Sequence, residues 1–124
     1  MKKQFIIGLA LALSSFFVQA ASDVITAQEA SSLSAEKKAI ILDVREDEEW
    51  NTGHIKGAIH IPLNQINNRL SELKSYKDST IITQCRSGKR SMKALELLKT
   101  AGFNVKSMDG GIQAWEQQGL SIEK

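Results

Sequence analysis

The residues best suited to chemistry lie in one short stretch, residues 83–91, which holds the only cysteine in the sequence, Cys85. Three cations follow it within five residues: Arg86, Lys89 and Arg90. Neighbouring positive charge favours the thiolate, which is the nucleophilic form of cysteine. The alternative is a buried, unreactive cysteine, but a purely structural thiol is not expected beside so basic a segment. The stretch therefore predicts a nucleophilic cysteine that attacks or receives an anionic group.

The segments on either side predict how Cys85 is positioned. Residues 80–83 form a short β-branched run typical of a buried strand, and residues 91–101 are helix-forming up to Gly102. Cys85 is therefore expected on a turn between a strand and a helix. In such a turn the backbone N–H groups can converge on one point, and the positive end of the helix dipole adds to them. Both effects stabilise a negative charge on the sulfur.

The rest of the chain alternates predicted strands with predicted helices. Further strands are expected at residues 24–25, 39–42, 58–61 and 104–108. Further helices are expected at residues 26–34, 46–53, 64–70 and 110–119. In the helix after the cysteine, Met92, Leu95 and Leu98 share one face, which we expect to be buried. Strands separated by helices imply a parallel α/β sheet with ligands beyond the carboxyl ends of its strands, where Asp43 and Cys85 both lie.

The first twenty residues have the features of a signal peptide. Two lysines precede an uncharged, mainly apolar run at residues 5–18, and small residues lead up to Ala20. About fourteen apolar residues are fewer than the ~20 that a membrane-spanning helix needs. We therefore predict cleavage between Ala20 and Ala21 and export to the periplasm. The mature domain, residues 21–124, is not expected to associate with a membrane.

Charge and cysteine content limit the partners that this domain could have. The chain carries 16 basic and 14 acidic residues, and removing Lys2 and Lys3 leaves 14 of each. A formally neutral domain lacks the basic field that binds nucleic acid, so nucleic acid is not expected as a partner. One cysteine and two histidines without zinc-site spacing argue against a metal site, and no cofactor is expected. A lone thiol in an oxidising compartment indicates that Cys85 has a functional role, and keeping it reduced implies a thiol-reducing partner protein.

Three ordered motifs resemble the rhodanese-like sulfurtransferases, specifically the small, single-domain exported kind. The motifs are residues 42–46 with 53–62, residues 85–91, and residues 110–115. They are similar to the family's N-terminal signature, active-site loop and C-terminal signature, and they span most of the predicted mature chain. The resemblance implies one rhodanese-like domain with an α/β fold, in which helices flank a five-stranded parallel sheet.

The resemblance also implies a persulfide mechanism at Cys85. Its thiolate would attack the outer sulfur of a small anionic donor such as thiosulfate and release sulfite. The persulfide would then pass its sulfur to cyanide or a thiol acceptor. The loop residues expected to bind the donor are Arg86, Ser87, Gly88, Lys89, Arg90 and Ser91. Loop amides and cations would stabilise both the departing sulfite and the persulfide anion.

Asp43 and Arg45 are supporting candidates by the same resemblance. Asp43 would orient the loop through hydrogen bonds or an ion pair with Arg90, and Arg45 would approach the donor. The alternatives are a carboxylate satisfied by nearby backbone N–H groups and a surface ion pair between Arg45 and neighbouring glutamates. Neither His54 nor His60 adjoins the cysteine in the sequence, so we expect structural rather than catalytic histidines, with His54 stabilising a turn.

The nearest rival function is that of a cysteine-dependent phosphatase or arsenate reductase. A phosphatase loop has its arginine six positions after the cysteine, where this chain has Ser91, and Arg90 comes one residue early. The shorter loop favours a single sulfur atom over a phosphoryl group. A second alternative is a non-catalytic sulfur-carrier or binding module, although such domains commonly lack the cysteine. A thiol oxidoreductase is disfavoured because the chain has no Cys-x-x-Cys and no resolving cysteine.

Overall fold

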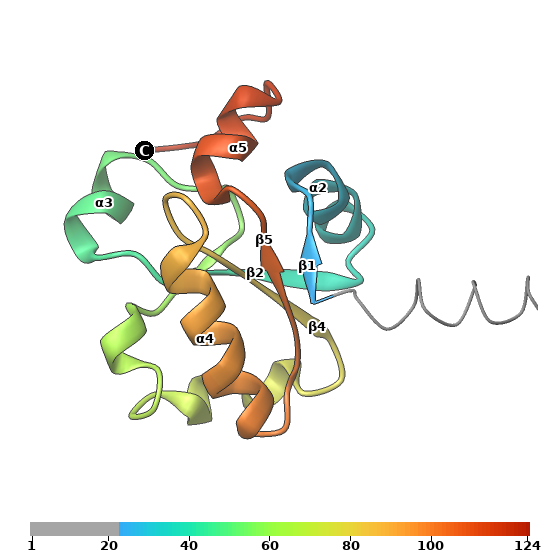
Figure 1. Cartoon of the computed structure of the whole chain (residues 1–124), viewed down its shortest axis with the longest axis vertical. Helices are drawn as coiled ribbons and strands as arrows, with labels where there is room; N and C mark the ends of the chain where they lie inside the picture. The colour runs from blue at the N-terminus through green and yellow to red at the C-terminus, as the bar shows by residue number, and fades with distance from the viewer. Residues whose placement is uncertain (1–22) are drawn as a thin grey trace, which may run out of the picture.

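The computed structural model describes residues 23–124 of the chain (Figure 1). The predicted signal peptide and its cleavage site after Ala20 lie outside these residues, so both stay predictions. Within the described range no helix has the length and apolar character that crossing a membrane requires.

A five-stranded parallel sheet forms the centre of the domain, as the sequence predicted. The strands are β1 (Val24–Ile25), β2 (Ala39–Asp43), β3 (Ile59–His60), β4 (Thr80–Gln84) and β5 (Asn104–Met108). Their order across the sheet is β1-β5-β4-β2-β3, and every neighbouring pair is parallel. The central strand β4 therefore lies between β5 and β2, and its carboxyl end leads directly to Cys85.

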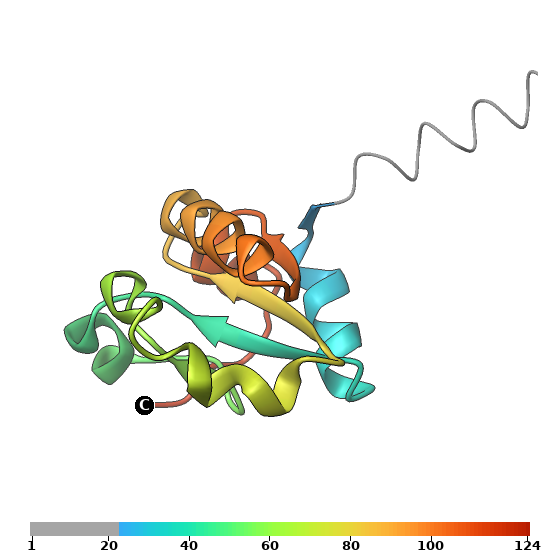
Figure 2. The same ribbon diagram turned by 90° about the horizontal axis from the view of Figure 1, so that it is seen from below.

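Helices cover the sheet on both faces. They are α2 (Ala27–Ala35), α3 (Asp47–Thr52), α4 (Lys89–Thr100) and α5 (Gly111–Gln117), with 3₁₀ segments η1 (Leu63–Gln65) and η2 (Leu70–Tyr76). The predicted capping box at the start of α2 is confirmed, because Thr26 Oγ1 accepts from Glu29 N at 3.0 Å and Glu29 Oε1 accepts from Thr26 N at 3.1 Å. Figure 1 shows α4 and α2 on opposite sides of the sheet, and Figure 2 shows α4 lying along β4.

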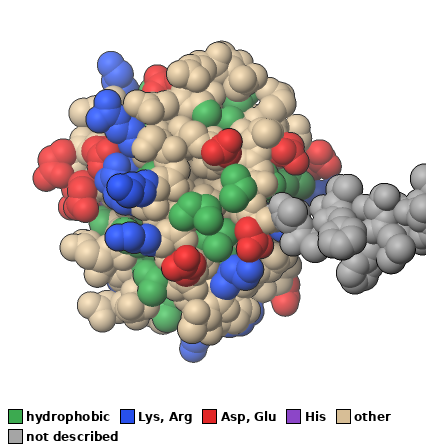
Figure 3. All heavy atoms as spheres, in the orientation of Figure 1, with side chains coloured by type: hydrophobic (Ala, Val, Ile, Leu, Met, Phe, Trp, Pro, Cys, Tyr) green, Lys and Arg blue, Asp and Glu red, His purple; other side chains and the backbone are tan. Residues whose placement is uncertain are grey.

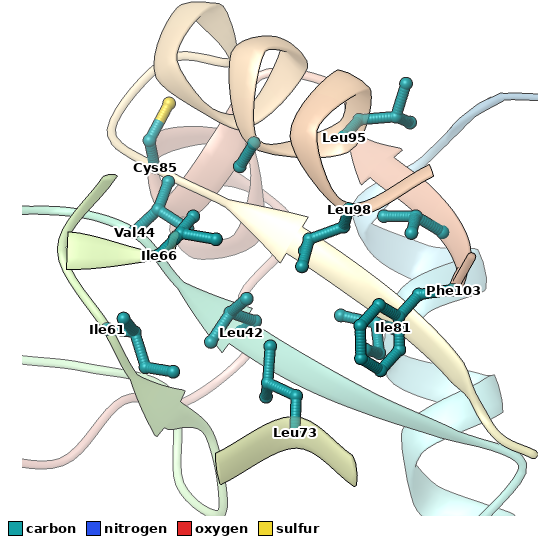
Figure 4. Close-up of a cluster of buried hydrophobic side chains, with 12 residues drawn as sticks. Leu42, Val44, Ile61, Ile66, Leu73, Ile81, Cys85, Leu95, Leu98 and Phe103 are labelled. Atoms are coloured by element: carbon teal, nitrogen blue, oxygen red, sulfur yellow. The ribbon is translucent and has the colours of Figure 1, made fainter. Parts of the chain in front are cut away.

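Two apolar clusters fill the spaces between the sheet and these helices. The first includes Leu42, Ile61, Ile66, Leu73, Ile81, Leu95 and Leu98, and the second includes Ile41, Ile55, Ile82, Met108, Ile112 and Trp115. Cys85 lies at one end of the first cluster, and Figure 4 shows its sulfur directed away from Val44 and Ile66. Burying each aliphatic side chain stabilises the fold by about 1.5–3 kcal/mol, so the loop that carries Cys85 packs against a stable hydrophobic core.

The segment between β3 and β4 differs from the sequence prediction. We expected one α-helix from Asn64 to about Leu70, but the chain forms the separate 3₁₀ segments η1 and η2 instead. Asn67 and Asn68 lie between them. Asparagine side chains compete for backbone hydrogen bonds and favour turns, which explains why a continuous helix does not form.

The buried face of α4 also differs in part. The helix begins at Lys89, two residues earlier than predicted, and its buried residues are Ser91, Ala94, Leu95 and Leu98. Leu95 and Leu98 therefore confirm the prediction. Met92 does not, because 38% of its surface is exposed.

Candidate active site

Cys85 lies in the turn between β4 and α4, as the sequence predicted. Only 1% of its surface is exposed. The backbone N–H of Gly88 donates to its Sγ at 3.1 Å, which closes the loop around the sulfur. Gly88 has φ +114°, a conformation that side chains other than glycine rarely adopt, and it directly precedes the first residue of α4. The loop thus depends on glycine at the point where it turns into the helix.

Helix α5 holds the other side of the loop through its backbone. Ile112 N donates to the carbonyl of Cys85 at 2.8 Å, and Gln113 N donates to the carbonyl of Arg86 at 3.2 Å. Gly111 permits this approach, because a Cβ there would lie 2.2 Å from the Cys85 carbonyl oxygen. These hydrogen bonds hold the Cys85 and Arg86 carbonyls toward α5. The orientation of these two peptide groups of the loop is therefore set by α5.

The surroundings of Cys85 stabilise its thiolate. Burial of the sulfur opposes ionisation, but hydrogen bonds from the backbone amides of Ser91, Gly88 and Ser87, and from the Ser91 hydroxyl, outweigh it. The net effect lowers the pKa of the Cys85 thiol below its ordinary value. The sequence had pointed to the loop cations as well as the amides, and the structure identifies amide and hydroxyl donors as the main stabilising groups.

Ser91 lies beneath the loop rather than on its outer rim. The residue is fully buried, and its hydroxyl donates to the Gly88 carbonyl at 2.9 Å. The same oxygen is 2.8 Å from Ser107 Oγ, and Thr83 Oγ1 donates to the Ser91 carbonyl at 2.9 Å. We predicted Ser91 as a donor-binding residue, and its position indicates instead that it supports the sulfur from below.

The three cations in and next to the loop differ in exposure and in ion pairing. Arg86 and Lys89 are exposed, and within residues 23–124 neither forms an ion pair. Arg90 instead pairs with Glu49 of α3, with Nη1 to Oε1 at 2.6 Å and Nη2 to Oε2 at 2.9 Å. This bidentate pair lowers the pKa of Glu49 to about 2, chiefly through the hydrogen bonds from Arg90. Arg86 and Lys89 are therefore the charges available to an incoming anion.

The predicted ion pair between Asp43 and Arg90 is wrong, because Asp43 pairs with Arg45. The Arg45 Nη2 donates to Asp43 Oδ2 at 2.8 Å, and Arg45 Nε donates to Asp43 Oδ1 at 3.0 Å. The backbone N–H of Arg45 also donates to Asp43 Oδ1, which matches the alternative in which backbone groups satisfy this carboxylate. Both residues are buried. Asp43 thus holds its own strand end together rather than the cysteine loop.

Arg45 is a buried residue whose guanidinium is occupied by several acceptors. Its guanidinium also donates to the carbonyls of Gly53 at 2.8 Å and Glu49 at 3.3 Å, so its hydrogen bonds connect the segment after β2 to the middle of α3 and to the residue that follows the helix. The predicted alternative of a surface ion pair with glutamates is wrong, because Arg45 is buried and pairs with Asp43, whereas its approach to a donor stays a prediction. Its charge is compensated by the Asp43 carboxylate.

The rings of His54 and His60 both stack on the ring of Trp50. The ring centroids are 3.7 Å apart for Trp50 and His54, and 4.7 Å apart for Trp50 and His60. His54 Nδ1 is 3.0 Å from the Trp50 carbonyl oxygen, and His60 Nε2 is 2.8 Å from the Arg45 carbonyl oxygen. This stack holds the segment around α3 in place, in keeping with a structural role for both histidines.

A polar cavity of about 350 Å³ opens beside the loop. Its lining residues are Arg45, Glu49, Thr52, Arg86, Ile112, Gln113 and Glu116. Figure 3 shows Lys and Arg side chains gathered on the side of the molecule where the Cys85 loop and the start of α4 lie. The cavity is large enough for a small anion or a small thiol, and Arg86, which has no ion-pair partner in the described part of the chain, provides a positive charge at its wall.

Sequence reasoning missed three residues that the structure places around the loop. Sequence patterns placed Glu49 only in a predicted helix and Ser107 only in a predicted strand, and they placed Gly111 in the last helix and the C-terminal motif without a contact to the cysteine loop. The spacing of Gly110 and Gly111 could have indicated a close backbone approach. Nothing in the sequence indicated which cation Glu49 binds or that Ser107 faces Ser91, because both contacts join distant segments.

Comparisons with known proteins agree with this geometry. The family model of the rhodanese-like domain matches residues 26–118. YtwF of Bacillus subtilis is 36% identical over 94 residues, which cover 76% of this chain and 89% of YtwF. A protein of Allochromatium vinosum named sulfurtransferase is 37% identical over 84 residues, covering 67% of this chain and 77% of that protein.

A solved structure supports the same assignment at the level of the fold. The rhodanese-related protein of Thermoplasma volcanium superposes with a TM-score of 0.74 and 31% sequence identity, over 81% of this chain and 96% of that one. The fold of the described residues, a five-stranded parallel sheet with helices on both faces, is therefore that of a rhodanese-like domain. Since the family model also spans most of the chain, including the Cys85 loop, this protein belongs to the rhodanese-like domain family.

Proposed function

We propose that this protein is a sulfurtransferase that carries sulfane sulfur as a persulfide on Cys85. The observation that carries the proposal is the convergence of loop amides on a buried sulfur whose thiol pKa is lowered. A thiolate held in this way is a prepared nucleophile, and the same donors would stabilise a persulfide anion. The relative of Allochromatium vinosum that is named a sulfurtransferase adds support.

The proposed reaction has two steps. In the first, the Cys85 thiolate attacks the outer sulfur of a thiosulfate-like donor, and an S–S bond forms as the S–S bond of the donor breaks. Sulfite leaves with the electron pair of the broken bond. In the second, a thiolate or cyanide attacks the outer sulfur of the persulfide, and Cys85 leaves as the thiolate. The enzyme ends each cycle in the state in which it began, so no cofactor is required.

The two unpaired cations give this reaction its preference for an anionic donor. Arg86 and Lys89 are exposed on the loop, whereas Arg90 is engaged by Glu49. Positive charge at the rim would attract the donor and stabilise the charge that develops on the departing sulfite. We therefore assign donor binding to Arg86, Lys89 and the amides of the loop, and we assign to Arg90 the role of fixing the loop against α3.

Intact-mass spectrometry tests the proposed function directly. Protein incubated with thiosulfate should gain the mass of one sulfur atom, and Cys85→Ser should gain none. Hydrolysis of p-nitrophenyl phosphate, measured on the same sample, tests the rival phosphatase chemistry. Phosphate release without a sulfur adduct would overturn the proposal. Absence of both would indicate a binding module.

We also propose that the protein acts after export to the periplasm. The support is the sequence of the first twenty residues, which lie outside the described structure. A protein reductant would then be needed to keep Cys85 reduced. N-terminal sequencing of the protein recovered from a bacterial periplasmic fraction should begin at Ala21. A sequence that begins at Met1 would contradict export with cleavage.

A further inference from the structure

Ser107 lies on β5, directly beside the strand that leads into the cysteine loop. It pairs in register with Thr83 of β4, and its side chain is 1% exposed. Neighbouring residues in the register of parallel strands direct their side chains to the same face of the sheet. Thr83 and Ser107 both reach the first turn of α4 in this way, and both contact Ser91.

The direction of the hydrogen bond between the two serines follows from counting protons. Ser91 Oγ is 2.9 Å from the Gly88 carbonyl oxygen, which can only accept, so the one hydroxyl proton of Ser91 is used there or on the cysteine sulfur. Ser107 Oγ is 2.8 Å from the same Ser91 oxygen. Ser107 must therefore be the donor in the contact between the two serines.

We propose that Ser107 is a positioning residue that orients the Ser91 hydroxyl for donation to the Cys85 sulfur. When a hydroxyl oxygen accepts a hydrogen bond, its own O–H cannot point toward that donor. The Ser91 proton is therefore directed away from Ser107, toward the acceptors on the opposite side of its oxygen. Those acceptors are the Gly88 carbonyl, 2.9 Å from Ser91 Oγ, and the Cys85 sulfur, whose thiolate the Ser91 hydroxyl stabilises. In the thiolate or the persulfide, the negatively charged sulfur is the stronger acceptor.

The pair acts by orientation and transfers no proton. Ser107 keeps its proton and donates it to Ser91, and Ser91 keeps its proton and turns it toward the sulfur. The Gly88 carbonyl still accepts from Met92 N at 3.3 Å when Ser91 turns away. The serine pair thus connects the sheet interior to the charge on Cys85 without leaving a backbone group unpaired.

The test measures the ionisation of Cys85 and needs no sulfur donor. The rate of alkylation by iodoacetamide is followed against pH in wild type and in Ser107→Ala. We expect the midpoint to rise by about half a pH unit, which lowers the thiolate fraction roughly threefold at a pH well below the midpoint. Thr83→Val is the matched control, since it removes a buried hydroxyl that contacts the Ser91 carbonyl and not the Ser91 hydroxyl. An unchanged midpoint in Ser107→Ala would overturn the proposal.

A double-mutant cycle distinguishes positioning from general loosening of the structure. In the Ser91→Ala background, Ser107→Ala should shift the midpoint no further, because the hydroxyl through which it acts is absent. A full additional shift would overturn the proposal. The inference rests on the proposed function only for its effect on turnover. A failure of thiosulfate to form a persulfide would therefore leave the alkylation result interpretable.

A measurement on the wild-type protein covers the case in which Ser107→Ala does not fold. The hydroxyl proton of Ser107, buried and hydrogen-bonded, is followed by NMR while the pH is raised through the Cys85 midpoint. Its resonance should shift with the same midpoint, because the Ser91 oxygen becomes a better acceptor when its own proton turns to the thiolate. A resonance that does not change through that midpoint would overturn the proposal.

Discussion

The segments that follow the neighbouring strands β2 and β4 each place a charged or ionisable group at the same edge of the sheet. At the end of β2, Asp43 and Arg45 neutralise each other in a buried pair, and the remaining Arg45 donors bind backbone carbonyls. After β4, the groups around Cys85 converge on the sulfur, while Arg86 and Lys89 are exposed and form no ion pair with any residue from 23 to 124. Position at the carboxyl end of a strand is therefore not enough to identify a reactive group. What distinguishes the Cys85 loop is charge and hydrogen-bonding capacity left available to a ligand.

The largest effect on stability should come from breaking the buried ion pair between Asp43 and Arg45. Asp43→Asn leaves the Arg45 guanidinium buried without its counter-charge, and breaking such a pair costs about 3–5 kcal/mol. Chemical denaturation should show this loss. The folded fraction should still form the Cys85 persulfide at nearly the wild-type rate. If persulfide formation by the folded protein became much slower while stability stayed unchanged, Asp43 would instead take part directly in the reaction.

A slightly smaller effect is expected from Gly111→Ala, which disturbs the Cys85 loop from the α5 side. The added Cβ would collide with the Cys85 carbonyl, and φ is +54°, so we expect a loss of about 2–4 kcal/mol together with reduced persulfide formation. Gly119→Ala is the matched control, because Gly119 has φ +76° but no atom within 4 Å of the added Cβ. Equal effects of the two substitutions on stability and on rate would refute the close approach as the cause.

Removing the unpaired cations should change kinetics rather than stability. We expect Arg86→Met with Lys89→Met to lower kcat/KM for thiosulfate by about tenfold to hundredfold, with unfolding midpoints close to wild type. Lys93→Met, on the exposed surface of α4 one turn after Lys89, is the matched control and should retain wild-type kinetics. Wild-type kinetics in the double variant would show that these charges do not bind the donor.

The smallest effect should come from the partly exposed pair between Glu49 and Arg90. The pKa of Glu49 falls from 4.5 to about 2, so the pair contributes stability above pH 4.5 that is lost as the pH falls toward 2. Solvent screening limits the contribution to about 1 kcal/mol. Denaturation measured across this range should show the loss in wild type, and Glu49→Gln should lack that part of the pH dependence. An identical pH dependence in both proteins would contradict the assigned pKa.

Local sequence patterns predicted the sheet, the cysteine turn and the capping box, because each depends on residues close together in the chain. The apolar run at 39–42 and the β-branched run at 80–83 both formed neighbouring central strands. The partners of the charged residues were not predictable in the same way. Arg90 binds Glu49, forty-one residues earlier in the chain, and no local pattern in the sequence distinguishes Glu49 from the other acidic residues as its partner.

The ionisation of Cys85 tests the central claim most directly, namely that amides and a hydroxyl hold the thiolate while the cations serve the donor. The midpoint of iodoacetamide alkylation against pH is measured for wild type and for the variant with both Arg86→Met and Lys89→Met. We predict a wild-type midpoint below the ~8.5 of a free cysteine and nearly the same midpoint in the variant. A wild-type midpoint at or above 8.5, or a rise of about one unit in the variant, would contradict this division of roles.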